Sequence, residues 1–141
     1  AEPVTEFDRS LRDLVNKLDA LLRAAAGGVG LAAPQIGVPL RVIAFNLDGR
    51  AGHLVNPRLE VSGRPVVADE ACLSAPGGWW PLARPVAAVA RGRDMHGRPV
   101  TVRAVGMLAR VLQHEVDHLD GVLFSDHLPA EERERFLAAL S

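Results

Sequence analysis

The sequence contains few of the residues that cross-link a chain or stack on bases. Its 141 residues include one cysteine, no tyrosine and an aromatic fraction of only 4%. A single cysteine excludes an internal disulfide, and so few aromatic rings argue against a surface on which nucleic-acid bases stack. No uninterrupted apolar stretch approaches the roughly 18 residues of a membrane-spanning helix. These absences exclude a disulfide-rich scaffold and a helical membrane protein.

Excess charge of either sign is also missing. Sixteen Lys and Arg residues oppose 17 Asp and Glu residues, which gives a net charge of −1 and a pI near 6.6. This balance does not provide the basic surface that binds nucleic acids or anionic membranes. Glu2 and Glu6 precede the first apolar stretch, and their sign is opposite to that of a leader peptide. We therefore expect no direct nucleic-acid or membrane partner.

The remaining composition is that of a globular protein. Hydrophobic residues make up 48% of the chain and charged residues 23%, which excludes a disordered chain. The length fits one domain that buries most of its apolar surface. We expect residues 1–141 to form a single domain.

Apolar residues near the start of the chain recur at helical spacing. A Thr5 and Asp8 pair resembles a capping box with Asp in place of Glu, and Gly27 and Gly28 provide a stop signal. Between them lie Phe7, Leu11, Leu14, Val15, Leu18, Leu21 and Leu22. The segment predicts an N-terminal helix, which a loop of small residues follows.

The middle of the chain predicts a series of short strands separated by Pro, Gly and Asp. The expected strands are Arg41–Asn46, His53–Asn56, Arg58–Val61, Val66–Ala68, Pro85–Ala90 and Val100–Ala104. Strands so close in sequence favour antiparallel pairing over βαβ crossovers. Helices are predicted from Gly106 to about Asp120 and from Ala130 to Leu140. The expected class is α+β, with short antiparallel strands around a central helix and a helix near each end.

The sequence His114-Glu115-Val116-Asp117-His118 lies on the predicted central helix. Positions four apart in a helix are separated by about 40° around its axis, so the two imidazoles face the same way. Neutral imidazole is a good ligand for Zn²⁺ or Fe²⁺, and this spacing lets both histidines bind one ion. The motif therefore predicts a metal-binding helix.

The helical wheel places Glu115 within the apolar face of this helix. A separate polar stripe contains Arg110, Gln113, Asp117 and Asp120. A buried carboxylate is costly because desolvation opposes its charge, so Glu115 at this place indicates a cation or a chemical task. The alternative is a core helix whose His and Glu side chains have backbone partners.

The only thiol, Cys72, is the candidate for a third ligand. A lone cysteine is most often an inert core residue, but next to a pair of imidazoles its thiolate would bind a divalent cation strongly. Three protein ligands leave a fourth position open, as in catalytic sites. Water bound there loses a proton near neutral pH, and Glu115 is placed to accept it as general base.

Three segments together resemble the signature motifs of the peptide deformylase family. They are Gly28-Val29-Gly30-Leu31-Ala32-Ala33-Pro34-Gln35, Glu70-Ala71-Cys72-Leu73-Ser74 and Gln113-His114-Glu115-Val116-Asp117-His118. The similarity also includes Asn56-Pro57, Arg84-Pro85, Asp94–Gly97 and Leu119–Leu123, and it extends from about Pro3 to Leu128. The order and spacing of the motifs match those of the family.

The resemblance implies a role for each matching residue. Cys72, His114 and His118 would bind the metal and Glu115 would be the general base. The Gln35 amide and the Leu73 backbone N–H would stabilise the oxyanion. The remaining matches would bind substrate: Val29, Gly30, Glu70 and Ala71 along the peptide, and Gly28, Met107 and Val111 around the methionine side chain.

The implied reaction is hydrolysis of the N-formyl group from N-formyl-methionyl nascent peptides, which releases formate. The family implies Fe²⁺ in the cell, and Zn²⁺ or Ni²⁺ can replace it in a purified sample. It also implies a cytoplasmic bacterial enzyme, with the ribosome near the peptide exit as a further partner.

One departure from the family keeps an alternative open. The family has Gly where this chain has Ala71, and an added methyl group is costly if the native φ there is positive. A catalytically impaired homologue that only binds peptides is therefore one alternative. A zincin-like metalloprotease, suggested by the His-Glu-x-x-His pattern alone, is another.

Overall fold

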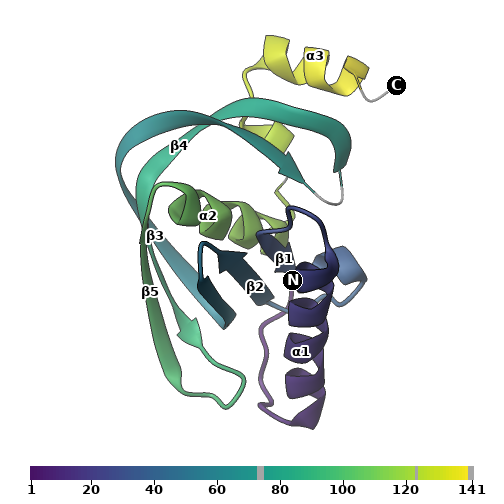
Figure 1. Cartoon of the computed structure of the whole chain (residues 1–141), viewed down its shortest axis with the longest axis vertical. Coiled ribbons are helices and arrows are strands. Elements are labelled where there is room, and N and C mark those ends of the chain that lie inside the picture. Colours follow the sequence, from purple (N-terminus) through teal and green to yellow (C-terminus); the bar gives the residue numbers. More distant parts are fainter. Residues whose placement is uncertain (73–74, 123, 140–141) are drawn as a thin grey trace.

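The computed structural model describes residues 1–72, 75–122 and 124–139, and an antiparallel sheet with three α-helices forms its framework (Figure 1). The elements in chain order are α1 (Arg9–Ala24), β1 (Gly30–Ala32), η1 (Ala33–Ile36), β2 (Val42–Leu47), β3 (Arg50–Cys72), β4 (Ala75–Arg93), β5 (Pro99–Val105), α2 (Met107–Leu119), η2 (Phe124–His127) and α3 (Ala130–Ala139). The five strands pair in sequence order. The expected α+β class is confirmed.

The N-cap of helix α1 is Asp8, three residues after the predicted N-cap Thr5. The Asp8 side chain, not Thr5, accepts a hydrogen bond from Leu11 N at 3.1 Å and caps the helix. The chain leaves the helix through Ala25, and Gly27 follows with φ of +72°. The predicted stop is therefore confirmed, whereas the predicted cap is wrong.

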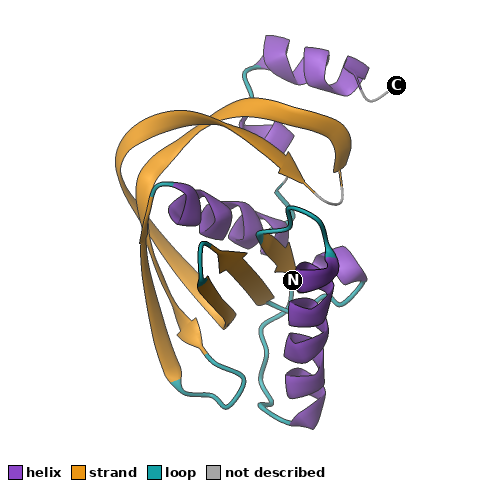
Figure 2. Ribbon diagram, in the orientation of Figure 1, coloured by secondary structure: helices purple, strands orange, loops and turns teal. Residues whose placement is uncertain are grey.

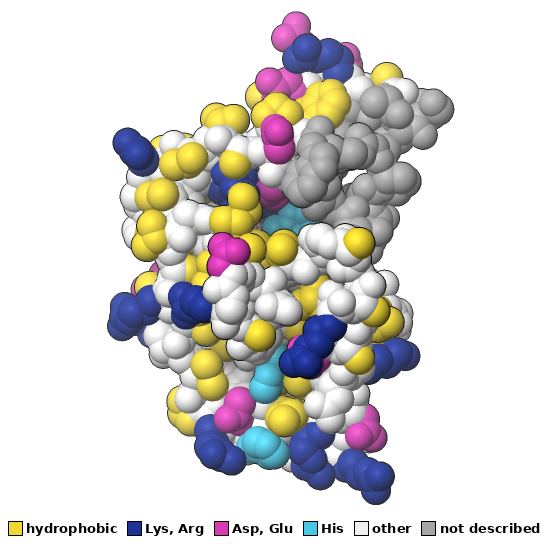
Figure 3. Space-filling view, viewed as in Figure 1, with side chains coloured by type: hydrophobic (Ala, Val, Ile, Leu, Met, Phe, Trp, Pro, Cys, Tyr) yellow, Lys and Arg dark blue, Asp and Glu magenta, His cyan; other side chains and the backbone are white. Residues whose placement is uncertain are grey.

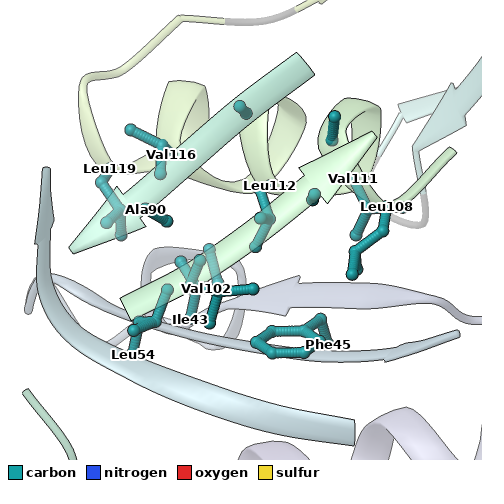
Figure 4. Close-up of a cluster of buried hydrophobic side chains, with 14 residues drawn as sticks. Ile43, Phe45, Leu54, Ala90, Val102, Leu108, Val111, Leu112, Val116 and Leu119 are labelled. Carbon is teal, nitrogen blue, oxygen red and sulfur yellow. The ribbon is translucent and has the colours of Figure 1, made fainter. Parts of the chain in front are cut away.

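Two hydrophobic clusters cover opposite faces of β2. Ile43 and Phe45 point into the cluster around α2 (Figure 4), and Val42 and Ala44 belong to the cluster around α1. A strand covered on both faces is apolar throughout, which explains why this segment shows no alternation of apolar and polar residues. Helix α2 thus lies in the core, as the sequence predicts.

Strands β3 and β4 are much longer than expected. The prediction of short strands is wrong here, because Pro57 and Gly63 interrupt the pattern without ending the strand. The register shifts between Val55 and Arg58 and between Ser62 and Pro65, so the irregular residues are accommodated as bulges.

The far part of this hairpin extends beyond the other strands. Strand β2 pairs with β3 only up to Val55, and β5 pairs with β4 only from Ala87 onward. We call residues 62–72 and 75–86 the upper ribbon; it arches over α2 in Figures 1 and 2. Cys72 lies at the end of this ribbon.

The surface agrees with the balanced composition. Basic and acidic side chains are interspersed over the face shown in Figure 3. Among the described residues, no helix has the length and apolar character needed to cross a membrane.

Candidate metal centre

Helix α2 brings the two predicted imidazole ligands together. The His118 Nε2 and His114 Nε2 atoms are 3.2 Å apart, and the rings are arranged edge to face. Two nitrogen ligands of one tetrahedral ion, each about 2.0–2.1 Å from it, would lie roughly 3.3 Å apart. The observed spacing therefore fits a shared metal ion.

The third predicted ligand lies at the edge of what the structure describes. Strand β3 ends at Cys72, but the Cys72 side chain is outside the described part, as are Leu73 and the side chain of Ala71. Within the described residues, no third His, Cys, Asp or Glu joins His114 and His118. The role of Cys72 remains a prediction.

The Glu70 carboxylate orients the His114 ring. His114 Nδ1 lies 2.9 Å from Glu70 Oε1, and because an ionised carboxylate only accepts hydrogen bonds, Nδ1 is the donor. The proton on Nδ1 leaves the Nε2 lone pair for a metal. Arg84 binds the same carboxylate with both Nε and Nη2, at 2.6 and 3.0 Å.

The charge of Glu70 is maintained despite its burial. Its side chain is about 5% exposed, and burial by itself would raise its pKa. The hydrogen bonds from His114 and Arg84 and the charge of Arg84 outweigh this effect and lower the pKa to about 2. Glu70 is thus a stable anion, and because its carboxylate is committed to these partners, a substrate contact would have to come from its backbone.

Glu115, the predicted general base, lies next to Gly30 of the first family motif. Glu115 is 4% exposed and its carboxylate lies against Gly30 of β1. A Cβ atom at Gly30 would lie 2.5 Å from Glu115 Oε2, so only glycine leaves room for the carboxylate. The two residues are far apart in sequence, and the fold places them in contact.

The Gln35 side chain is fixed by the backbone of β1. Its Oε1 accepts a hydrogen bond from Ala32 N at 2.8 Å, which orients the amide and directs the Nε2 donor away from Ala32. An amide donor held in this way is suited to a developing negative charge.

The other predicted substrate residues have different environments. Met107 is 49% exposed, whereas Val111 is 4% exposed and belongs to the core cluster. Val29 packs against that cluster, and Gly28 is half-buried. The structure thus places Met107, more than Val111, where a ligand could contact its side chain.

The sequence model of the polypeptide deformylase family matches residues 1–134. The chain belongs to the peptide deformylase family. Peptide deformylases from Acidothermus cellulolyticus and Parafrankia sp. are 51% and 49% identical to it over 140 and 142 residues, which cover 99% of this chain and 77% of each relative. The expected family is confirmed.

Solved deformylase structures have the same fold. The Legionella pneumophila peptide deformylase superposes with a TM-score of 0.89 at 38% identity, over 99% of this chain and 84% of the other. The Synechococcus elongatus peptide deformylase in complex with actinonin gives 0.90 at 35% identity, over 99% and 78%. The family is metal-dependent, and the two converging imidazoles fit that property.

Sequence reasoning missed the residues that support this deformylase site. Arg84 also binds Asp117 at 2.9 Å, and Asp117 in turn contacts His127 Nε2 at 2.8 Å. In the sequence, Arg84 stands out only as part of the Arg84-Pro85 similarity to the family. His127 has no ligand-like spacing to other histidines. Their roles depend on distant contacts that no local pattern encodes.

Replacing Gly30 with Ala should impair this deformylase selectively. The new Cβ would push Glu115 from its place, so we expect kcat to fall by more than about tenfold while metal content is unchanged, since misplacement of about 1 Å can be this costly. Gly92→Ala is the control, because its Cβ would meet Val55 O at 2.8 Å and does not meet Glu115. Equal kcat values in the two variants would contradict the role of Gly30.

Proposed function

We propose that this chain hydrolyses the N-formyl group of N-formyl-methionyl peptides and releases formate, with residues 1–141 acting as one catalytic domain. The family acts on such peptides, and the convergence of His114, His118 and Glu115 on one helix is the observation that carries the proposal. The proposal thus depends on two imidazoles that can bind one metal ion next to a buried carboxylate.

Cys72, His114 and His118 would hold the metal ion. The donor set of one thiolate and two imidazoles suits Fe²⁺, which we expect in the cell, and Zn²⁺ or Ni²⁺, which we expect in purified samples. When bound, such an ion supplies Lewis-acid activation of a water molecule and of the formyl carbonyl. Glu70 supports this set because it fixes the tautomer and orientation of His114.

Glu115 transfers the proton in the proposed reaction. Its carboxylate accepts a proton from the attacking water and delivers it to the amine nitrogen of the leaving peptide. Burial of Glu115 against Gly30 limits the positions that the carboxylate can occupy. The chain thereby holds its base in one place without a further side-chain movement.

Gln35 and Leu73 would stabilise the oxyanion that develops on the formyl oxygen. The Gln35 Nε2 group donates one hydrogen bond, and its direction is set by the bond from Ala32 N to Oε1. The Leu73 backbone N–H would donate the second, and Leu73 lies outside the described residues. Such donors typically contribute about 3 kcal/mol each to the transition state.

The peptide backbone would bind along β1. In the strand order of the described sheet, β1 is an edge that pairs only with β2, so its other side can accept an added strand. Val29 and Gly30 would contact the peptide on one side. The backbone of Glu70 and Ala71 would contact it on the other side. Gly28, Met107 and Val111 would surround the methionine side chain.

Nascent chains on a bacterial ribosome are the natural source of this substrate. We propose that the enzyme acts in the cytoplasm close to the peptide exit. Because the net charge is −1, the chain has no overall excess of positive charge to attract ribosomal RNA, and we expect the encounter to depend on the nascent peptide.

Formate release from formyl-Met-Ala-Ser tests the proposal. The protein is purified anaerobically, stripped with a chelator and reloaded with Fe²⁺, Ni²⁺ or Zn²⁺. We expect turnover to require the metal and to return on reloading. Bound metal without formate release would overturn the proposal.

The alternative of an impaired homologue predicts a strong effect of Ala71→Gly. If φ at position 71 is negative, Ala imposes no backbone strain, so we expect Ala71→Gly to leave kcat/KM nearly unchanged. The paired register is irregular between Glu70 and Cys72, which places position 71 at that irregularity. A much larger gain in kcat/KM for Ala71→Gly would favour the impaired homologue.

A further inference from the structure

Three residues of the polar stripe of α2 face the upper ribbon instead of solvent, whereas the fourth, Asp120, is exposed and pairs with Arg41. Arg110 and Gln113 are 6% and 5% exposed, and Asp117 is 22% exposed at its side chain. We call these three residues the polar seam. The upper ribbon passes over this side of the helix in Figure 1, which explains why a polar stripe is buried.

One side chain of the seam binds both strands of the ribbon. Arg110 Nη1 donates to Glu70 Oε2 and to Leu82 O, and Nη2 donates to Val66 O. Val66 and Glu70 belong to β3 and Leu82 to β4. A single planar guanidinium therefore fixes three points of the ribbon relative to α2.

In the described part of the chain, the apolar residues Leu82 and Trp80 of the ribbon pack against Leu128 and not into the hydrophobic cluster around α2. The hydrophobic cluster around α2 includes Ala88 and Ala90 of β4 and Leu54 of β3, but no described residue of the upper ribbon. A ribbon of only two strands is marginally stable by itself. Polar contacts therefore help to hold it over α2, and they include the bond from Gln113 Nε2 to Pro85 O at 3.0 Å.

We propose that Arg110 is a positioning residue for the metal centre. It holds the ribbon that ends in Cys72 against the helix that carries His114 and His118, and it braces Glu70, which orients His114. The inference rests on the proposed function in one respect, because it takes Cys72 as a ligand. Arg110 itself would touch neither substrate nor metal.

Cobalt binding to three variants tests the proposal. Arg110→Met keeps an apolar side chain of similar reach and removes every donor. We expect its affinity for Co²⁺ to fall about 10–100-fold, as is typical when a partner outside the ligand shell is lost. The thiolate-to-cobalt charge-transfer band should weaken, and kcat should fall more than KM rises. Arg110→Lys restores the charge next to Glu70 but not the planar fork, so it should give intermediate values.

Arg64→Met is the matched control, because Arg64 is an exposed residue of the same ribbon. It should match the wild type in affinity and spectrum. If Arg110→Met does not fold, the Lys variant carries the test. Wild-type affinity and a full thiolate band in the folded Arg110 variants would overturn the positioning role. Absence of that band in the wild type would instead overturn the assignment of Cys72 as a ligand.

Discussion

Glu115→Gln should lower kcat/KM for formyl-Met-Ala-Ser by about 10²–10⁴-fold, the usual range for loss of a general base. The amide has the same shape as the carboxylate, so it keeps the contact with Gly30 but cannot accept a proton. His114 and His118 are unchanged, and the metal should stay bound. Steady-state kinetics together with metal analysis of the same preparation measure both effects.

A surface glutamate provides the control for this result. Glu60 is 76% exposed at its side chain and pairs with Arg91 on the sheet surface, so Glu60→Gln should leave kcat/KM unchanged. Loss of metal and activity in equal proportion in Glu115→Gln would mean that Glu115 is structural. Activity close to that of the wild type would exclude Glu115 as the base.

Cys72→Ala should weaken metal binding more than any change outside the ligand shell. Loss of an outer partner costs about 10–100-fold in affinity, so loss of a thiolate ligand should exceed about 100-fold. Of the proposed ligands, only the two imidazoles then remain, with their Nε2 atoms 3.2 Å apart. Competition with a chelator of known affinity measures the change, and thermal unfolding without metal shows whether the variant folds.

The same variant separates the two kinds of metallohydrolase. A zincin-like protease predicts a ligand set without Cys72 and cleavage of internal peptide bonds. Full metal affinity in Cys72→Ala would favour that alternative. Lost affinity with an intact fold would support the deformylase ligand set, because Cys72 contributes through its sulfur.

Local spacing accounts for the parts of the site that the sequence could predict. His114, Glu115 and His118 share one helix, so their relative placement follows from helical geometry alone. The clustering of the imidazoles and the burial of Glu115 are confirmed for this reason.

Short strands and interrupted strands were harder to predict. Gly30–Ala32 lies in the segment for which the sequence predicts a loop, because the many small residues there show no strand pattern, but it forms a strand by pairing with β2. Strands β3 and β4 were divided at Pro and Gly, although bulges let pairing continue past these residues. Pairing between distant segments decides such cases, and a single-chain pattern does not record it.

The sequence by itself determined the family, the α+β class and the metal-binding helix, because helical periodicity and motif spacing are local properties of the chain. The tertiary structure alone decided that Gly30 faces Glu115, that Glu70 orients His114, and that Arg110 lies buried under the upper ribbon. A polar stripe on a helix looks the same in sequence whether water or a strand covers it, and the difference arises only when remote hydrogen-bond partners are brought to it.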